Sequence, residues 1–301
     1  MAILRIMMCL WLCVAASAVN AQSATTGTDF WFGFFENVDL PQGDELVVTI
    51  TAQSAASGLI SIPGQNWQQS FYVSAAGSTQ INIPLLEGEV VTEQFLDNRA
   101  IHVESNALVS VFATNYAQSS SDASRILPTP LLGTKYIAAS YAGSNNSGSQ
   151  LLIVGTEDGT EVQITPSATT SAGNAAGVPF NVQLDAGQCY RIVASGTGDL
   201  TGTLILATSV SGKCRPFAVF GGAVCANIPS NCALACDHLY EQLYGLDKWG
   251  TSYITTPFDF VINPSYAGIT APRYSYRILA SENSTNIVID DVTAIVLQAG
   301  E

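Results

Sequence analysis

The sequence predicts an all-β fold, built from tandem β-sandwich-like repeat units with one short helical connector. Apolar and polar residues alternate in short runs that end at Gly, Asn, Asp, Ser or Pro, as they do in half-buried strands. A Gly-Thr-x-aromatic phrase begins at Gly27, Gly133 and Gly250, which indicates repeated units. Leucines at helical spacing, preceded by the capping residue Asp237, predict a helix over 237–246.

The first residues have the features of an export signal. Arg5 supplies a positive charge, residues 6–14 are apolar, and residues 19–21 form a small-residue cleavage site. A membrane-spanning helix needs about 20 apolar residues, so this run is too short to be one. We therefore expect a signal peptide over 1–21, a secreted or cell-surface protein, and no transmembrane segment in the mature stretch.

The repeated phrase divides the mature chain into units. The predicted boundaries are 22–132 for unit one, 133–249 for unit two and 250–301 for a truncated third unit. Within unit two, residues 151–165 predict a hairpin, because Asp158-Gly159 suits a tight turn. Residues 277–290 repeat this pattern in the third unit. We expect the third unit to pack against unit two or against further sequence.

The aromatic run Phe30–Phe35 has two interpretations. An exposed aromatic platform could bind a glycan or a protein. However, alternation places aromatic side chains on both faces of this strand, and a strand that is apolar on both faces is usually buried between layers. The run therefore predicts core.

Charge excludes one class of partner. The chain has 10 Lys and Arg against 24 Asp and Glu, with a formal net charge of −14. Nucleic-acid binding needs clustered basic residues, which this scattered set does not provide. Acidic turns such as the one at Glu157 could bind Ca²⁺, but no D-x-D-x-D-G loop is present and turn chemistry explains them.

Five cysteines remain after signal cleavage, and an oxidising compartment favours disulfides. They are Cys189, Cys214, Cys225, Cys232 and Cys236. The repeat alignment places Cys189 and Cys214 on neighbouring strands of unit two, which makes them a candidate pair. A zinc site of Cys225, Cys232, Cys236 and His238 is the alternative, but their spacing does not match paired zinc knuckles.

Catalysis is not predicted. The chain has two histidines, and His102 lies in an alternating strand like an ordinary surface or edge residue. Cys236, Asp237 and His238 are consecutive, whereas a nucleophile and its base usually converge from distant parts of a chain. No nucleophile elbow or phosphate-binding glycine loop is present. We expect neither enzymatic activity nor a cofactor.

Four phrases stand out from this background. They are Asp199-Leu200-Thr201-Gly202-Thr203, a G-x-x-C-x-x-I-P phrase at 222–229, C-D-H-L-x-E-Q-L at 236–243 and W-G-x-x-Y at 249–253. Together they resemble the IgGFc-binding protein N-terminal domain family. The residues that carry the resemblance are Asp199, Thr201, Gly202, Asp237, His238, Glu241, Gln242, Trp249 and Gly250.

The resemblance implies a module of recognition or adhesion with an extracellular protein or glycan as its ligand. It also implies a disulfide between Cys225 and Cys236, which leaves Cys232 over. It assigns no ligand-contacting residues. The alternative function is a structural spacer, repeated along a longer cell-surface protein.

Overall fold

The computed structural model describes residues 25–38, 44–118, 120–144, 147–208, 213–228, 236–256, 276–290 and 292–301. Strands dominate these residues, so the all-β prediction is confirmed. The expected signal peptide lies outside them. No helix in the described ranges has the length and hydropathy needed to cross a membrane.

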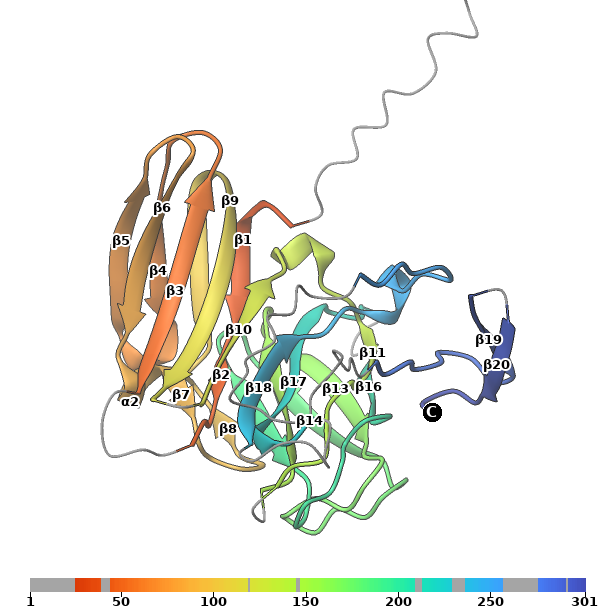
Figure 1. Cartoon of the computed structure of the whole chain (residues 1–301). Helices are drawn as coiled ribbons and strands as arrows, with labels where there is room; N and C mark the ends of the chain where they lie inside the picture. The colour runs from red at the N-terminus through yellow and green to blue at the C-terminus, as the bar shows by residue number, and fades with distance from the viewer. Residues whose placement is uncertain are drawn as a thin grey trace, which may run out of the picture.

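The first part of the chain folds into a seven-stranded sheet (Figure 1). Its strands are β1 (Gly27–Phe32), β3 (Glu45–Ala52), β4 (Ala56–Ile62), β5 (Trp67–Val73), β6 (Gly77–Ile83), β9 (Ile101–Ala117) and β10 (Ser120–Ile126). The long strand β9 organises the sheet. Its first part pairs antiparallel with β1 and β4, and its second part with β3 and β10. Strand β5 extends the β4 half and β6 the β3 half.

Short elements connect these strands. They are the parallel pair β2 (Phe34–Phe35) and β7 (Glu89–Val90), the helix α2 (Leu85–Gly88), and the 3-10 turns η1 (Pro63–Gln65) and η2 (Thr129–Leu131).

The second part of the chain forms two further sheets. The five-stranded sheet has the order β18 (Asp237–Gln242), β17 (Phe217–Ala226), β12 (Ser149–Gly155), β15 (Cys189–Val193) and β8 (Leu96–Asp97). The four-stranded sheet has the order β11 (Lys135–Ile137), β16 (Leu204–Thr208), β13 (Thr160–Thr165) and β14 (Phe180–Leu184). The 3-10 turn η3 (Leu246–Lys248) follows β18.

The five-stranded sheet lies between two hydrophobic cores. On β12, Leu152 and Val154 join the first core, whereas Leu151 and Ile153 join the second. Strand β17 alternates in the same way between Phe220 and Val219. A strand buried on both faces needs a continuous apolar sequence, which explains the LLIV and FAVF runs.

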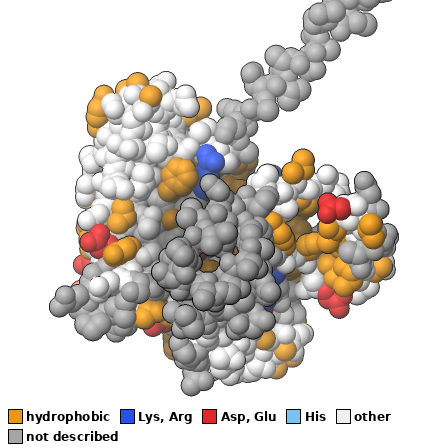
Figure 2. Space-filling model, viewed as in Figure 1, with side chains coloured by type: hydrophobic (Ala, Val, Ile, Leu, Met, Phe, Trp, Pro, Cys, Tyr) orange, Lys and Arg blue, Asp and Glu red, His pale blue; other side chains and the backbone are white. Residues whose placement is uncertain are grey.

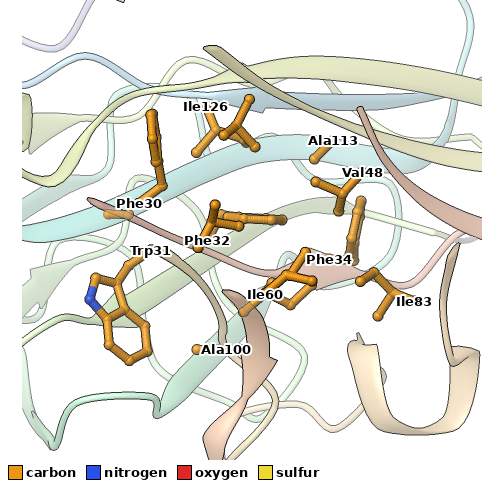
Figure 3. Packing of buried hydrophobic residues seen from close by; sticks show 14 of the residues in the cluster. Phe30, Trp31, Phe32, Phe34, Val48, Ile60, Ile83, Ala100, Ala113 and Ile126 are labelled. Atoms are coloured by element: carbon orange, nitrogen blue, oxygen red, sulfur yellow. The ribbon is translucent and has the colours of Figure 1, made fainter. Parts of the chain in front are cut away.

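The first core contains the aromatic run of β1 and β2 (Figure 3). Phe30, Phe32 and Phe34 are fully buried, and Trp31 is 9% exposed. Figure 3 shows them among Val48 and other aliphatic side chains of the seven-stranded sheet. The prediction of a core role for Phe30–Phe35 is confirmed.

A segment from the first part of the chain, which contains β8, adds an edge strand to the five-stranded sheet. Strand β8 pairs with β15 through Leu96 and Tyr190. Next to it, the Gln94 amide donates to the Arg191 carbonyl at 2.8 Å. The buried Arg191 guanidinium donates in turn to the Val91 carbonyl at 2.6 Å and to the Glu36 carboxylate. The first core thus contains residues from both sides of the boundary expected after residue 132. That the units are repeats of one another stays a prediction.

Two local predictions were wrong. Residues 151–165 do not form a hairpin, because β12 and β13 belong to different sheets and the turn at Gly159 carries the chain from one sheet to the other. Residues 237–246 do not form a helix, because 237–242 are strand β18 and the following turn is η3. In β18 the side chains of His238, Tyr240 and Gln242 are buried at every second position, the period of a strand.

The third part is a two-stranded sheet of β19 (Thr285–Ile289) and β20 (Val292–Leu297). Hydrophobic side chains gather on its surface (Figure 2), among them Val288 at 56% and Ile295 at 53% exposure. Arg277, which precedes β19, binds Asp199 of the second part of the chain at 2.8 Å. The packing expected for 250–301 as a unit stays a prediction.

Candidate functional site

The C-D-H-L-x-E-Q-L phrase at 236–243 lies where two sheets meet, and we call its contact with β10 the seam. Its strand, β18, is the edge of the five-stranded sheet and lies beside β10 of the seven-stranded sheet (Figure 1). Side chains of β10 accept the outward amides of β18 at alternate positions. The acceptors of the amides of His238, Tyr240 and Gln242 are Ser120 Oγ at 2.9 Å, Asp122 Oδ2 at 2.8 Å and Ser124 Oγ at 2.7 Å.

Side chains of β18 in turn accept backbone amides of β10 and of the residue that follows it. Gln242 Oε1 accepts the amide of Leu127 at 2.6 Å, and Asp237 Oδ1 accepts that of Ser121 at 3.0 Å. An exposed strand edge would otherwise present unpaired amides to any passing strand. Asp237 and Gln242 therefore serve to join the two sheets.

Burial sets the charges along the seam. Desolvation lowers the pKa of His238 to about 4, so the ring is neutral at physiological pH. Desolvation also raises the pKa of the Asp122 carboxyl. Burial likewise raises the pKa of Glu241, helped by the nearby charge of Asp122. The His238 ring packs edge-on against Phe35, with centroids 5.5 Å apart.

The disulfide implied by the family resemblance is confirmed. Cys225 in β17 bonds to Cys236, the residue before β18, with Cα atoms 5.1 Å apart. This bond ties the first residues of the seam to the neighbouring strand. Because it occupies both sulfurs, the alternative zinc site loses two of its four ligands. Cys232 lies outside the described residues.

The predicted pairing of Cys189 with Cys214 was wrong, and both thiols are free. Cys189 begins β15, and its side chain belongs to the first core, on the side of Leu152 and Val154. Cys214 is exposed on the connection between β16 and β17. The repeat alignment placed these residues on neighbouring strands, but β15 and β16 belong to different sheets.

The Asp199-Leu200-Thr201-Gly202-Thr203 phrase forms a turn that is hydrogen-bonded to Ser140 and Ser149 of the second part of the chain. Thr201 Oγ1 donates to the Ser140 carbonyl at 2.8 Å and accepts the Ser140 amide at 3.0 Å. The Leu200 amide donates to Ser149 Oγ at 2.6 Å. Gly202 has a φ of 89°, a conformation that favours glycine.

The W-G-x-x-Y phrase lies at the surface. Trp249 Nε1 donates to the Tyr244 carbonyl at 3.1 Å, and the Gly250 amide donates to Tyr253 Oη at 2.7 Å. These bonds close a local loop. Most residues that carry the resemblance are thus engaged in holding the fold.

His102 is not the ordinary surface or edge residue that the alternating pattern predicted, because β9 is paired on both sides there. Its ring stacks on Trp31 with centroids 3.9 Å apart, and its Nε2 lies 2.8 Å from Asp29 Oδ2. Its Nδ1 lies 3.8 Å from Glu104 Oε2. Asp29, His102 and Glu104 each place one possible ligand atom within 4.8 Å of the others, although exposed acidic groups are often found together without a metal. The hydrogen bond from His102 holds the pKa of Asp29 below its ordinary value.

One surface was missed by sequence reasoning. The outer face of the β6-β3-β9 half of the first sheet carries neutral polar and aromatic side chains, which we call the polar sheet face. They are Thr49 and Thr51 of β3, Ser78, Gln80 and Asn82 of β6, and Phe112, Thr114 and Tyr116 of β9. The sheet register places them in rows, such as Gln80–Thr49–Phe112 and Asn82–Val47–Thr114.

A charge-free stretch of sequence supplies the β3 and β6 residues of this surface. No Asp, Glu, Lys, Arg or His occurs between Glu45 and Glu87, although the protein as a whole is acidic. Figure 2 shows the consequence, because the surface over β3 and β9 is mostly white, with few charged side chains. Tyr116 is 43% exposed there. Exposed Tyr among Ser, Thr, Asn and Gln is the composition of many recognition surfaces.

Comparison with known proteins points to one family. A family model described as IgGFc binding protein matches residues 122–301. The IgGFc-binding protein of Homo sapiens is 24% identical over 253 residues, which cover 81% of this chain. The chain spans about 4% of the length of that relative. No solved structure matches.

Proposed function

Because this chain belongs to the IgGFc-binding protein family, we propose that it is an extracellular binding module that recognises a protein or glycan ligand. The relative that it matches is named for binding the Fc part of IgG. A matching role for this chain is part of the proposal.

The observation that carries the proposal is the polar sheet face. Its rows of hydroxyl and amide groups stand on a rigid sheet, and Phe112 and Tyr116 supply aromatic surface among them. Aromatic anchors surrounded by neutral hydrogen-bonding groups suit both glycan rings and protein surfaces. Charges on this face are few in a chain of net charge −14. They are Glu45, which pairs with Tyr116, and Arg125, whose guanidinium lies 5.5 Å from the Phe112 ring centroid.

The proposal includes no catalytic step. His238 is 1% exposed, and burial keeps its ring neutral with a pKa of about 4. A general base has to reach a substrate proton, which a ring packed against Phe35 and Tyr240 does not. These facts support a binding role over an enzymatic one.

Replacing Tyr116 with alanine tests the proposal. The wild-type chain is expected to retain a ligand when it is screened against IgG Fc and against a glycan array. Tyr116→Ala is expected to weaken that binding about tenfold, which is typical of losing one aromatic anchor. Surface plasmon resonance with the retained ligand measures the change.

Tyr72→Ala is the matched control. Tyr72 is also an exposed tyrosine of the same sheet, but it lies on the β4-β5 half, and its loss is expected to leave affinity unchanged. A chain that retains nothing in either screen would instead support the spacer function. Equal losses in both variants would contradict the polar sheet face as the contact surface.

A further inference from the structure

An arginine from the third part of the chain is bound by a cluster of polar and aromatic groups in the second part. Arg277 Nη1 donates to the Ser140 carbonyl at 2.5 Å, to Asp199 Oδ2 at 2.8 Å and to Thr201 Oγ1 at 2.8 Å. Its guanidinium lies over the Tyr141 ring, 4.0 Å from the centroid. An acid, a hydroxyl, a carbonyl and an aromatic face thus converge on one side chain.

Unit two builds this site from its own residues. Thr201 is held by both backbone groups of Ser140, and the Thr201 amide donates to Asp199 Oδ1 at 2.9 Å. Burial opposes charge on Asp199, yet hydrogen bonds from Thr201 and Arg277 hold the pKa of its carboxyl below the ordinary value. A planar guanidinium can lie flat on a ring while it donates to several acceptors, whereas an ammonium is a compact charge without a flat face to stack.

A second contact lies beside the arginine. Gly202 and Gly300 both have positive φ, at 89° and 84°, and meet backbone to backbone. A Cβ on Gly202 would lie 2.4 Å from the Gly300 carbonyl oxygen. Gly300 in turn donates its amide to the Ala280 carbonyl at 2.9 Å. The turn that holds Arg277 therefore also contacts the end of the β19–β20 sheet.

We propose that the Asp199–Thr203 turn, with Ser140 and Tyr141, is an arginine-recognition site that couples one β unit to the next. The occupant is the segment 276–301 of the same chain, which enters with Arg277 and abuts Gly202. This proposal gives the D-L-T-G-T phrase a structural role that is separate from ligand binding. The site fixes the third unit on the second, independently of the polar sheet face.

Hydrogen exchange of the β19–β20 sheet tests this coupling in the full chain. Arg277→Ala and Asp199→Asn are each expected to raise exchange rates over 285–297 about tenfold, the usual size of a strong cation–π and ion-pair contact. Exchange in β12 and β15 is expected to stay unchanged. Arg277→Lys keeps the charge but loses the planar contact, so it is expected to behave almost like Arg277→Ala.

Arg125→Ala is the matched control, because Arg125 also lies over an aromatic ring, that of Phe112, at 5.5 Å. It is expected to leave exchange over 285–297 unchanged. Unchanged exchange there in Arg277→Ala would overturn the proposal. An equal rise throughout unit two would also overturn it, and full protection in Arg277→Lys would contradict recognition of the guanidinium group.

A glycine pair tests the second contact separately. Gly202→Ala and Gly173→Ala both place a side chain at positive φ, at 89° and 92°. A Cβ on Gly173 meets open space, whereas one on Gly202 meets Gly300. Raised exchange over 285–297 is expected in Gly202→Ala alone. The same rise in both variants would assign the effect to backbone strain and contradict the contact.

Discussion

Replacing Tyr240 with alanine is expected to lower the free energy of unfolding by about 4 kcal/mol, as truncation of a large buried aromatic side chain does. Tyr240 is fully buried, and its ring packs against Phe34, Phe35 and Phe220 at centroid distances of 5.3–5.5 Å. Its side chain joins the seam strand β18 to the first core. Urea denaturation at neutral pH measures the loss.

Two controls separate packing from hydrogen bonding at this position. Tyr240→Phe keeps the ring but removes the hydroxyl that donates to the Gly33 carbonyl at 2.9 Å, and should cost about 1–2 kcal/mol. Tyr72→Ala removes an exposed tyrosine and should cost less than about 0.5 kcal/mol. A loss in Tyr240→Ala no larger than in Tyr72→Ala would contradict the described packing.

His238 is expected to make the protein sensitive to acid. Burial lowers its pKa from 6.5 to about 4, so the unfolded chain takes up a proton in this range while the folded chain does not. The stability contributed by neutral His238 is therefore present above pH 6.5 and is lost as the pH falls towards 4. Relative to His238→Phe, the wild type should lose about 3 kcal/mol between pH 7 and pH 4.

The comparison with His238→Phe is needed because another group acts in the opposite direction. Burial raises the pKa of Glu89 from 4.5 to about 7, so the folded chain binds its proton more tightly than the unfolded chain. That contribution is fully present below pH 4.5 and is lost as the pH rises through 7. Parallel pH dependence of the unfolding free energy in wild type and His238→Phe would show that His238 titrates freely.

The sequence predicted strands well where burial follows a simple period. The alternating runs and the two-faced aromatic run of β1 and β2 both became core strands, because the pattern directly encodes which faces meet apolar neighbours. In 237–246 the buried positions are His238, Tyr240 and Gln242, which are polar or amphipathic. The leucines alone therefore suggested a helical period that the backbone does not have.

Long-range pairing was harder to predict. The turn at Asp158-Gly159 indicates a chain reversal, but local turn chemistry cannot tell whether the next strand joins the same sheet or the one above it. The failure of the Cys189–Cys214 pair has the same origin. Cys225 lies on β17 and Cys236 directly precedes its paired strand β18, and the motif marked them correctly.

The polar sheet face was predictable in part. The absence of charge between Glu45 and Glu87 is visible in the sequence, and it marks a surface unlike the rest of an acidic protein. Which of these residues share a face depends on the register of β3, β6 and β9. That register is set by contacts across the first core, which no single segment encodes.

Amide exchange at three positions tests the central claim that the family phrase at 236–243 builds a seam between sheets. The amides of His238, Tyr240 and Gln242 point away from β17 and are bonded to side chains of β10. NMR should find all three as protected as the amides of β12, with Asp122→Ala exposing that of Tyr240 first. Exchange of all three at the rate of an open strand edge would contradict the account.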